Sequence, residues 1–196
     1  MKIKFKDDGA CMTFTNSGKP IAKFKTACEP FSSHQYGTPL SLDERFLLIG
    51  TWRKGLFCYS TETGKLIWQH GPGGVRQIIV FKDFILVEMY GRGVFKRNLK
   101  DGKIIDVFKM TAIDFLFYLN KNQIFTGPKN NNYFVITPEL KIIRKINRND
   151  IDQENHLSLI INGCKMSGKS LIICGFKQYP HGRYNKGKPV TFRVKL

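Results

Sequence analysis

Apolar and polar residues alternate along the chain in short runs, and turns rich in Gly, Asn, Asp and Pro separate the runs. Residues 75–81 (VRQIIVF), 112–119 (AIDFLFYL) and 157–161 (LSLII) are typical. Runs of this length, rich in β-branched and aromatic residues, predict strands. A helical pattern is confined to residues 143–154, where we expect a short turn of helix. The chain is therefore predicted to be all-β.

One pattern of strand, loop, strand, turn and strand occurs three times, in residues 44–71, 82–109 and 121–147. The turn ends in Gly-Lys in the first two copies and in Pro138-Glu139-Leu140 in the third. Both chain ends hold partial copies. The turns fall at Gly18, Gly64, Gly102, Leu140 and Gly187, which are 38 to 47 residues apart. This spacing is that of a four-stranded propeller blade.

The strand count predicts a single β-propeller domain over residues 1–196, with about five short blades. We expect three strands in the first unit, four in each of three middle units and three in the last. Pairing of Met1–Lys6 with Pro189–Lys195 would close the ring and protect the sheet edges. A four-bladed or irregular ring, with one end strand as a clasp, is the alternative.

The best-defined copy carries Gly50-Thr51, then Gly55-Leu56-Phe57, then Glu62-Thr63-Gly64-Lys65-Leu66-Ile67-Trp68. It resembles the repeat of quinoprotein-like β-propellers, whose blades show a Gly-Thr strand end, a Thr-Gly-Lys turn and a following Trp. The resemblance implies a propeller architecture. Quinoprotein enzymes are longer and carry cofactor and metal residues that have no counterparts located here. The resemblance therefore implies the fold and not a dehydrogenase activity.

The charge balance points to an acidic partner. Lys and Arg number 32 against 15 Asp and Glu, which gives a formal net charge of +17, and no acidic residue follows Glu154. Such a surface attracts acidic proteins or nucleic acid. No run reaches the roughly 18 apolar residues of a membrane span, and the N-terminus is charged where a signal peptide is apolar. We expect a cytoplasmic protein that does not bind membranes.

Residues Gly163 to Ser170 match the phosphate-binding loop of nucleotide hydrolases in residue type and spacing. Such a loop requires a preceding strand and a following helix, whose N-terminus meets the phosphates. Leu-Ile-Ile-Cys follows Ser170 and is stopped by Gly175, which predicts a strand. The segment is therefore interpreted as a hairpin turn between two strands.

No other motif indicates catalysis. The four histidines (His34, His70, His156, His181) have no ligand spacing, and the five cysteines include no C-x-x-C pair. We therefore expect reduced cysteines, no metal, no cofactor and no enzymatic activity, and we identify no small-molecule substrate.

Basic and aromatic residues recur in the loop that joins the second and third strands of several predicted four-stranded blades. Equivalent loops lie on one face of a propeller, and Tyr, Trp and Arg are the residue types that dominate interface energies. The predicted partner-binding residues are Trp52, Arg53, Lys54, Tyr90, Arg92, Lys177, Tyr179, His181, Arg183 and Tyr184.

These residues predict a non-enzymatic protein-binding module whose loops dock on an acidic partner. An inhibitor or immunity protein that caps a partner such as a bacterial toxin is one form of such a module. Binding of RNA or DNA through the same loops is the alternative, because interleaved aromatic and basic residues can stack bases and clamp phosphates.

Overall fold

A computed structural model describes residues 2–5, 10–15, 17–26, 40–42, 45–51, 53–110, 115–129, 132–151, 158–178 and 188–196. The chain forms two compact units, Met1–Thr111 and Ala112–Leu196. That the two together make a single propeller domain stays a prediction.

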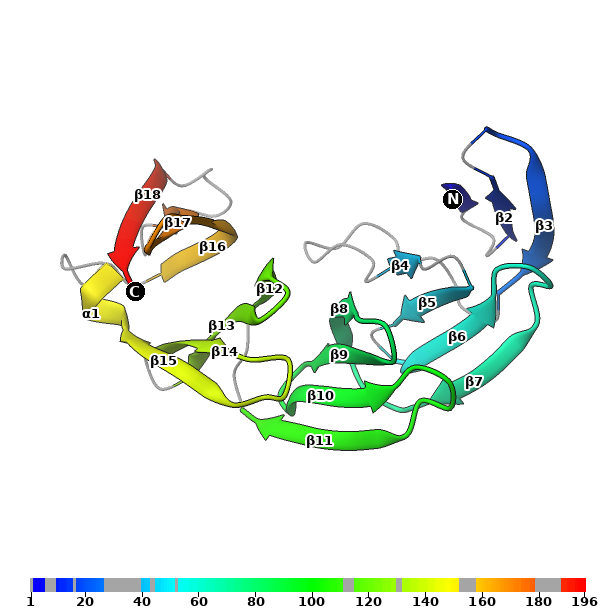
Figure 1. Cartoon of the computed structure of the whole chain (residues 1–196), viewed down its shortest axis with the longest axis horizontal. Helices are drawn as coiled ribbons and strands as arrows, with labels where there is room; N and C mark the ends of the chain where they lie inside the picture. The colour runs from blue at the N-terminus through cyan, green and yellow to red at the C-terminus, as the bar shows by residue number, and fades with distance from the viewer. Residues whose placement is uncertain are drawn as a thin grey trace. The chain divides into compact units, whose positions relative to one another are not determined.

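The described residues of the first unit form three antiparallel sheets, which follow one another along the chain (Figure 1). Their orders are β1-β2-β3, β4-β5-β6-β7 and β11-β10-β9-β8. The strands are β1 Lys2–Phe5, β2 Ala10–Phe14, β3 Pro20–Lys25, β4 Leu40–Leu42, β5 Phe46–Gly50, β6 Leu56–Ser60, β7 Leu66–His70, β8 Val75–Val80, β9 Phe84–Met89, β10 Gly93–Asn98 and β11 Ile104–Lys109.

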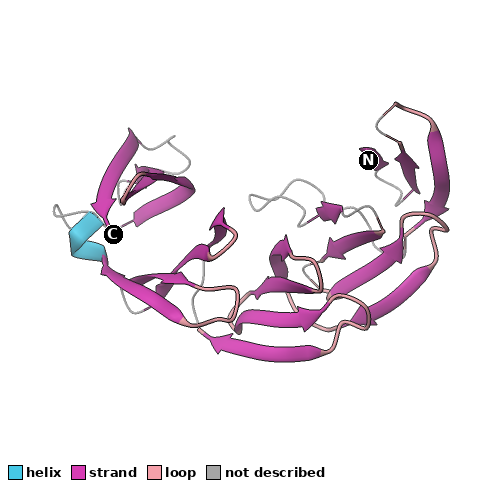
Figure 2. Ribbon diagram, viewed as in Figure 1, coloured by secondary structure: helices cyan, strands magenta, loops and turns pink. Residues whose placement is uncertain are grey.

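The second unit contains two further sheets, ordered β12-β13-β14-β15 and β16-β17-β18. Strands dominate the described residues and the one helix among them is α1, as Figure 2 shows. The elements are β12 Phe115–Asn120, β13 Gln123–Lys129, β14 Asn132–Ile136, β15 Ile142–Asn147, α1 Arg148–Ile151, β16 Ser158–Ser167, β17 Ser170–Gln178 and β18 Lys188–Lys195. In the part of the chain that the structure describes, no helix has the length and apolar character of a membrane span.

The predicted all-β propeller class is confirmed, and so is the strand count. The described sheets hold three, four, four, four and three strands in chain order. The helical turn expected within residues 143–154 is α1. Ring closure by the chain ends would join strands of different units, and it stays a prediction.

The repeat has a structural cause at the turn between the third and fourth strands. A register shift precedes this turn in β6–β7, in β10–β11 and in β14–β15. The residue that ends each turn has a positive φ: 68° at Gly64, 68° at Gly102 and 62° at Leu140. Glycine adopts this conformation at little cost, whereas Leu140 is an uncommon residue there. The regular spacing of Gly-Lys pairs in the sequence is thus explained by the same turn between the third and fourth strands of successive sheets.

At Gly187 the Gly-Lys pattern wrongly predicted the repeat turn that precedes a fourth strand. Lys188 begins β18, which pairs directly with β17 through partners such as Lys177 and Lys188. Among the described residues the strand after Gly187 is therefore the third of its sheet, and not a fourth strand that follows the turn of the repeat. The glycine itself lies outside the described residues.

The hairpin interpretation of the Gly163–Ser170 motif is confirmed. β16 ends at Ser167 and β17 begins at Ser170, with Ser167 and Ser170 paired across the turn. Gly168 has a φ of 58°, as a tight turn requires. Because a strand follows Ser170, no helix N-terminus is directed at this turn.

Each unit has its own apolar core. In the first unit Trp68 packs with Leu48, Cys58, Val87 and neighbouring residues, and its indole Nε1 donates a 3.0 Å hydrogen bond to the Leu99 carbonyl. In the second unit the rings of Phe115, Phe125 and Tyr133 pack together. Burying a large apolar side chain stabilises a fold by about 1.5–3 kcal/mol, so these clusters hold the strands together.

Cys164 of β16 gives a test of the second unit. Burial, with a smaller contribution from nearby Cys174, raises the pKa of the Cys164 thiol to about 12. Because the thiolate is the reactive species, iodoacetamide should modify Cys164 at pH 8 at least about a hundredfold more slowly in the folded protein than in urea. Peptide mapping by mass spectrometry reads the rate. Equal rates in the two states would contradict the burial of this thiol.

The same shift has a consequence for stability. The pKa of Cys164 rises from 9.0 when the thiol is free to about 12 in the fold. Because the folded state favours the neutral thiol, the contribution of Cys164 to the free energy of unfolding is complete below the pKa of the unfolded state. This contribution is lost as the pH rises through the pKa of the folded state. Comparing Cys164→Ala with the parent protein isolates this contribution from the titration of lysines, which both proteins share.

Candidate functional site

Two of the predicted loops lie together in the first unit. The 51–55 loop joins β5 to β6, and the 90–92 loop joins β9 to β10. Both are held by the connection between β7 and β8. Val75 N–H donates to the Thr51 carbonyl at 3.0 Å, and Tyr90 N–H donates to the Gly74 carbonyl at 2.8 Å. Loops at equivalent places of neighbouring sheets therefore share one backbone support.

Thr51 explains the Gly-Thr strand end of the repeat. Its buried hydroxyl donates to the Gly55 carbonyl at 2.9 Å and accepts from the Lys54 N–H at 2.9 Å. The side chain therefore closes the 51–55 loop from inside, and Arg53 and Lys54 are left exposed at its tip. This is a local hydrogen-bonded turn of the kind that Thr supports.

The 90–92 loop presents an aromatic ring and a cation. Tyr90 is 56% exposed and Arg92 is also exposed. The guanidinium of Arg76 lies 5.5 Å from the centroid of the Tyr90 ring, and it also faces the buried Glu88 carboxylate at 3.6 Å. Together Arg53, Lys54, Tyr90 and Arg92 form what we call the basic loop face.

The remaining predicted residues are placed less fully. Lys177 belongs to β17 and not to a loop, which corrects its predicted position. The other five lie outside the described residues: Trp52, Tyr179, His181, Arg183 and Tyr184. Their role in binding stays a prediction.

A pocket of about 410 Å³ lies next to the basic loop face, between the end of β7 and the strands β10 and β11. We call it the Arg97 pocket. It has both basic and apolar walls. The lining residues are His70, Gly71, Pro72, Met89, Arg92, Phe95, Arg97, Lys103 and Ile104.

Arg97 is a buried cation with a backbone partner. It is 7% exposed, and its Nη1 donates to the Gly102 carbonyl at 2.8 Å. Among the described residues, none accepts a hydrogen bond from its Nε. Burial lowers the pKa of Arg97 below its ordinary value, although an arginine stays protonated in proteins. The guanidinium also lies 5.7 Å from the centroid of the Phe95 ring. A buried positive charge that faces a carbonyl and an aromatic ring, with no carboxylate among its contacts in the described residues, favours the approach of an anion.

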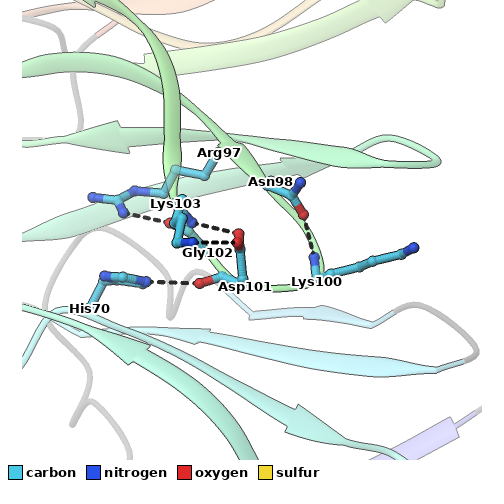
Figure 3. A network of polar contacts seen from close by, with 7 residues as sticks. All are labelled: His70, Arg97, Asn98, Lys100, Asp101, Gly102 and Lys103. Atoms are coloured by element: carbon cyan, nitrogen blue, oxygen red, sulfur yellow. Dashed lines mark hydrogen bonds and ion pairs between the residues drawn. The ribbon is translucent and has the colours of Figure 1, made fainter.

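The turn from Lys100 to Lys103 contributes Lys103 to the lining of the Arg97 pocket. Figure 3 shows the polar contacts of this turn. His70 Nε2 lies 3.1 Å from the Asp101 carbonyl, which can only accept, so Nε2 carries the proton. The Asp101 carboxylate accepts from the Lys103 N–H, and this bond lowers the pKa of that carboxyl. Figure 3 shows the His70 ring and the Arg97 guanidinium on one side of the turn and the Lys100 side chain on the other.

Sequence reasoning missed this pocket. It set His70 aside for lack of ligand spacing, and Arg97 and Lys103 were strand and turn residues. One signal was present: in the run Phe95-Lys96-Arg97, alternation places Arg97 on the same side of the strand as Phe95. Within the described residues, no three His, Cys, Asp or Glu side chains form a possible metal site.

Comparison with known proteins supports the fold and gives no family. No family model and no curated protein matches the sequence. The computationally designed protein Ika8 is similar over 98% of this chain and 57% of its own, with 14% identity and a TM-score of 0.62. BamB from Moraxella catarrhalis is similar over 99% of this chain and 58% of its own, with 12% identity and a TM-score of 0.63.

The computationally designed protein Ika4 is a third likeness, over 83% of this chain and 94% of its own, with 14% identity and a TM-score of 0.55. This chain thus spans just under three fifths of the length of Ika8 and of BamB. At these identities the likeness shows the fold alone. It confirms the propeller-repeat architecture that the resemblance implied.

Proposed function

We propose that this protein is a non-enzymatic binding module that docks on an acidic protein through its basic loop face. The observation that carries the proposal is the shared backbone support of the 51–55 and 90–92 loops, which presents two loops of exposed cations and one exposed Tyr together. Tyr and Arg are enriched among the residues that dominate interface energies, and a rigid support lowers the entropy cost of binding.

The net charge of +17 supports an acidic partner, because complementary charge speeds association and suppresses wrong partners. A capping inhibitor of the immunity-protein type would act through such a face by covering a partner's active site. Single-stranded nucleic acid is the competing ligand. A salt titration distinguishes nucleic acid from a protein partner. Nucleic-acid binding loses affinity steeply with added salt, whatever the base sequence, because phosphate contacts release counterions.

The proposal predicts that Tyr90→Ala weakens partner binding by about 2 kcal/mol or more, because truncating a central aromatic anchor typically costs that much. The partner is recovered by pull-down from the native host with and without nuclease treatment, and the affinity is then measured by calorimetry. Tyr118→Ala is the matched control, since Tyr118 is a 52% exposed tyrosine of the second unit.

Neutralising Arg53 and Arg92 to Gln should slow association and flatten its salt dependence, because exposed charges at an interface rim act mainly through steering. Melting temperatures of all variants should match that of the parent protein. Two results would contradict docking of an acidic protein on the basic loop face. One is that the partner is no longer pulled down after nuclease treatment, and the other is that Tyr90→Ala and Tyr118→Ala lower the partner affinity equally.

A further inference from the structure

The Arg97 pocket combines a cationic wall with an apolar one, and nothing in the proposed docking of a protein partner uses it as a pocket. We propose that it binds a small organic phosphate monoester, with the phosphate at the cations and the organic group against the apolar side chains. The argument rests on the charge, the fixed donors and the volume of the pocket.

The charge in and beside the pocket matches a dianion. Arg92, Arg97 and Lys103 contribute three positive charges, and Asp101, whose carboxylate lies 3.4 Å from the Lys103 ammonium, contributes one negative charge. With His70 counted as neutral, two positive charges remain. A phosphate monoester carries about −1.5 to −2 at neutral pH, whereas a carboxylate or a sulfate ester carries a single negative charge.

Arg97, the buried cation of the pocket, is held in place before any ligand arrives, whereas the Lys103 and Arg92 side chains are exposed. The Arg97 guanidinium is buried and fixed by the Gly102 carbonyl. The turn itself is fixed by the Trp68 indole on the Leu99 carbonyl and by the His70 ring on the Asp101 carbonyl. The Arg92 guanidinium lies 3.4 Å from the Pro72 carbonyl across the pocket mouth. Donors fixed in this way lose little conformational entropy when an anion binds.

The volume argues for an organic ester and against a free phosphate ion. A pocket of about 410 Å³ is within the range of small-molecule sites, about 300–1,000 Å³. A bare phosphate would leave most of it to water. Pro72, Met89, Phe95 and Ile104 give the remaining space an apolar lining, and Ile104 is 52% exposed although it is apolar. An aromatic or aliphatic group on the phosphate would bury this surface.

Titration calorimetry of the whole chain with three probes tests the proposal. Phenyl phosphate should bind saturably, and at least about tenfold more tightly than phenyl sulfate, which has a similar shape and a single charge. Inorganic phosphate should bind more weakly than phenyl phosphate, since it leaves the apolar wall uncovered. No saturation by phenyl phosphate up to about 10 mM, or equal binding of phenyl phosphate and phenyl sulfate, would overturn the proposal.

Variants then locate the site. Lys103→Gln and Arg92→Gln should each weaken phenyl phosphate binding about fivefold or more, without a change in melting temperature. Lys100→Gln is the matched control, because Lys100 lies in the same turn but does not line the pocket. Its side chain lies on the opposite side of the turn from the His70 ring and the Arg97 guanidinium (Figure 3). An equal effect of Lys100→Gln and Lys103→Gln would show diffuse attraction to a basic surface and overturn the assignment to the pocket.

The test is separable from that of the protein partner. The two sites share only Arg92, so Lys103→Gln should lower phenyl phosphate affinity and leave partner binding unchanged, whereas Tyr90→Ala should do the reverse. A phosphorylated peptide that competes with phenyl phosphate for the pocket, while phenyl phosphate itself binds no better than phenyl sulfate, would replace the small ligand by a modified protein and overturn the proposal as stated.

Discussion

Replacing Arg76 with Met should lower the free energy of unfolding by about 3–5 kcal/mol, because it removes a positive charge that faces a buried carboxylate. Glu88 is fully buried and Arg76 is 6% exposed, with 3.6 Å between Nη1 and Oε1. Met keeps much of the arginine volume, so the loss reports the charge and not a cavity. Urea unfolding followed by circular dichroism measures it.

The double variant Arg76→Met/Glu88→Leu is the control. Removing both charges from a buried pair is often neutral or stabilising, so this variant should recover most of the stability lost by Arg76→Met alone. Lys103→Gln gives a second comparison, since it breaks the exposed ion pair with Asp101 and should leave the melting temperature unchanged. If the double variant were as unstable as the single one, packing and not charge would explain Arg76.

The buried pair connects the fold to the proposed function. Arg76 stands between Glu88 in the core and the Tyr90 ring on the surface. A cation held beneath an aromatic face limits the motion of that ring. Arg76→Met should therefore weaken partner binding as well as stability, whereas Tyr90→Ala should affect binding alone.

The sheets could be predicted from the sequence because each strand is short, rich in β-branched and aromatic residues and bounded by turn residues. The Gly64 and Gly102 turns are visible in the sequence because a positive φ selects glycine. Gly187 shows the limit of this inference. A Gly-Lys pair marks the turn of the repeat only when a third strand precedes it, and in the last described sheet the strand after Gly187 is itself the third strand, paired with β17.

The Arg97 pocket could not be predicted from local patterns. His70 and Asp101 are 31 residues apart, and only the packing of neighbouring sheets brings them together. The loops were easier, since their composition repeats from copy to copy. Local sequence patterns thus indicated which loops are exposed. The structure was needed to show which cations line the same pocket.

The last prediction concerns this pocket. Gly102→Ala should destabilise the first unit by about 2–4 kcal/mol, which combines the cost of a positive φ for an L-residue with that of overpacking. Gly102 has a φ of 68°, and an added Cβ would lie 2.5 Å from Cδ2 of His70 and 2.7 Å from Cε3 of Trp68. Neither ring can yield easily, because Trp68 is buried and His70 is bonded to the same turn.

Gly91→Ala separates the two costs. Gly91 has nearly the same φ, 69°, and its added Cβ would meet nothing within 4 Å. That variant should therefore lose only the conformational part, about 1–2 kcal/mol. The difference between the two variants measures how tightly the 100–103 turn packs on β7, and this packing fixes Arg97 and Lys103. If Gly102→Ala and Gly91→Ala were equally stable, the turn would be free to move away from β7, and the pocket would lack the rigidity on which phosphate binding depends.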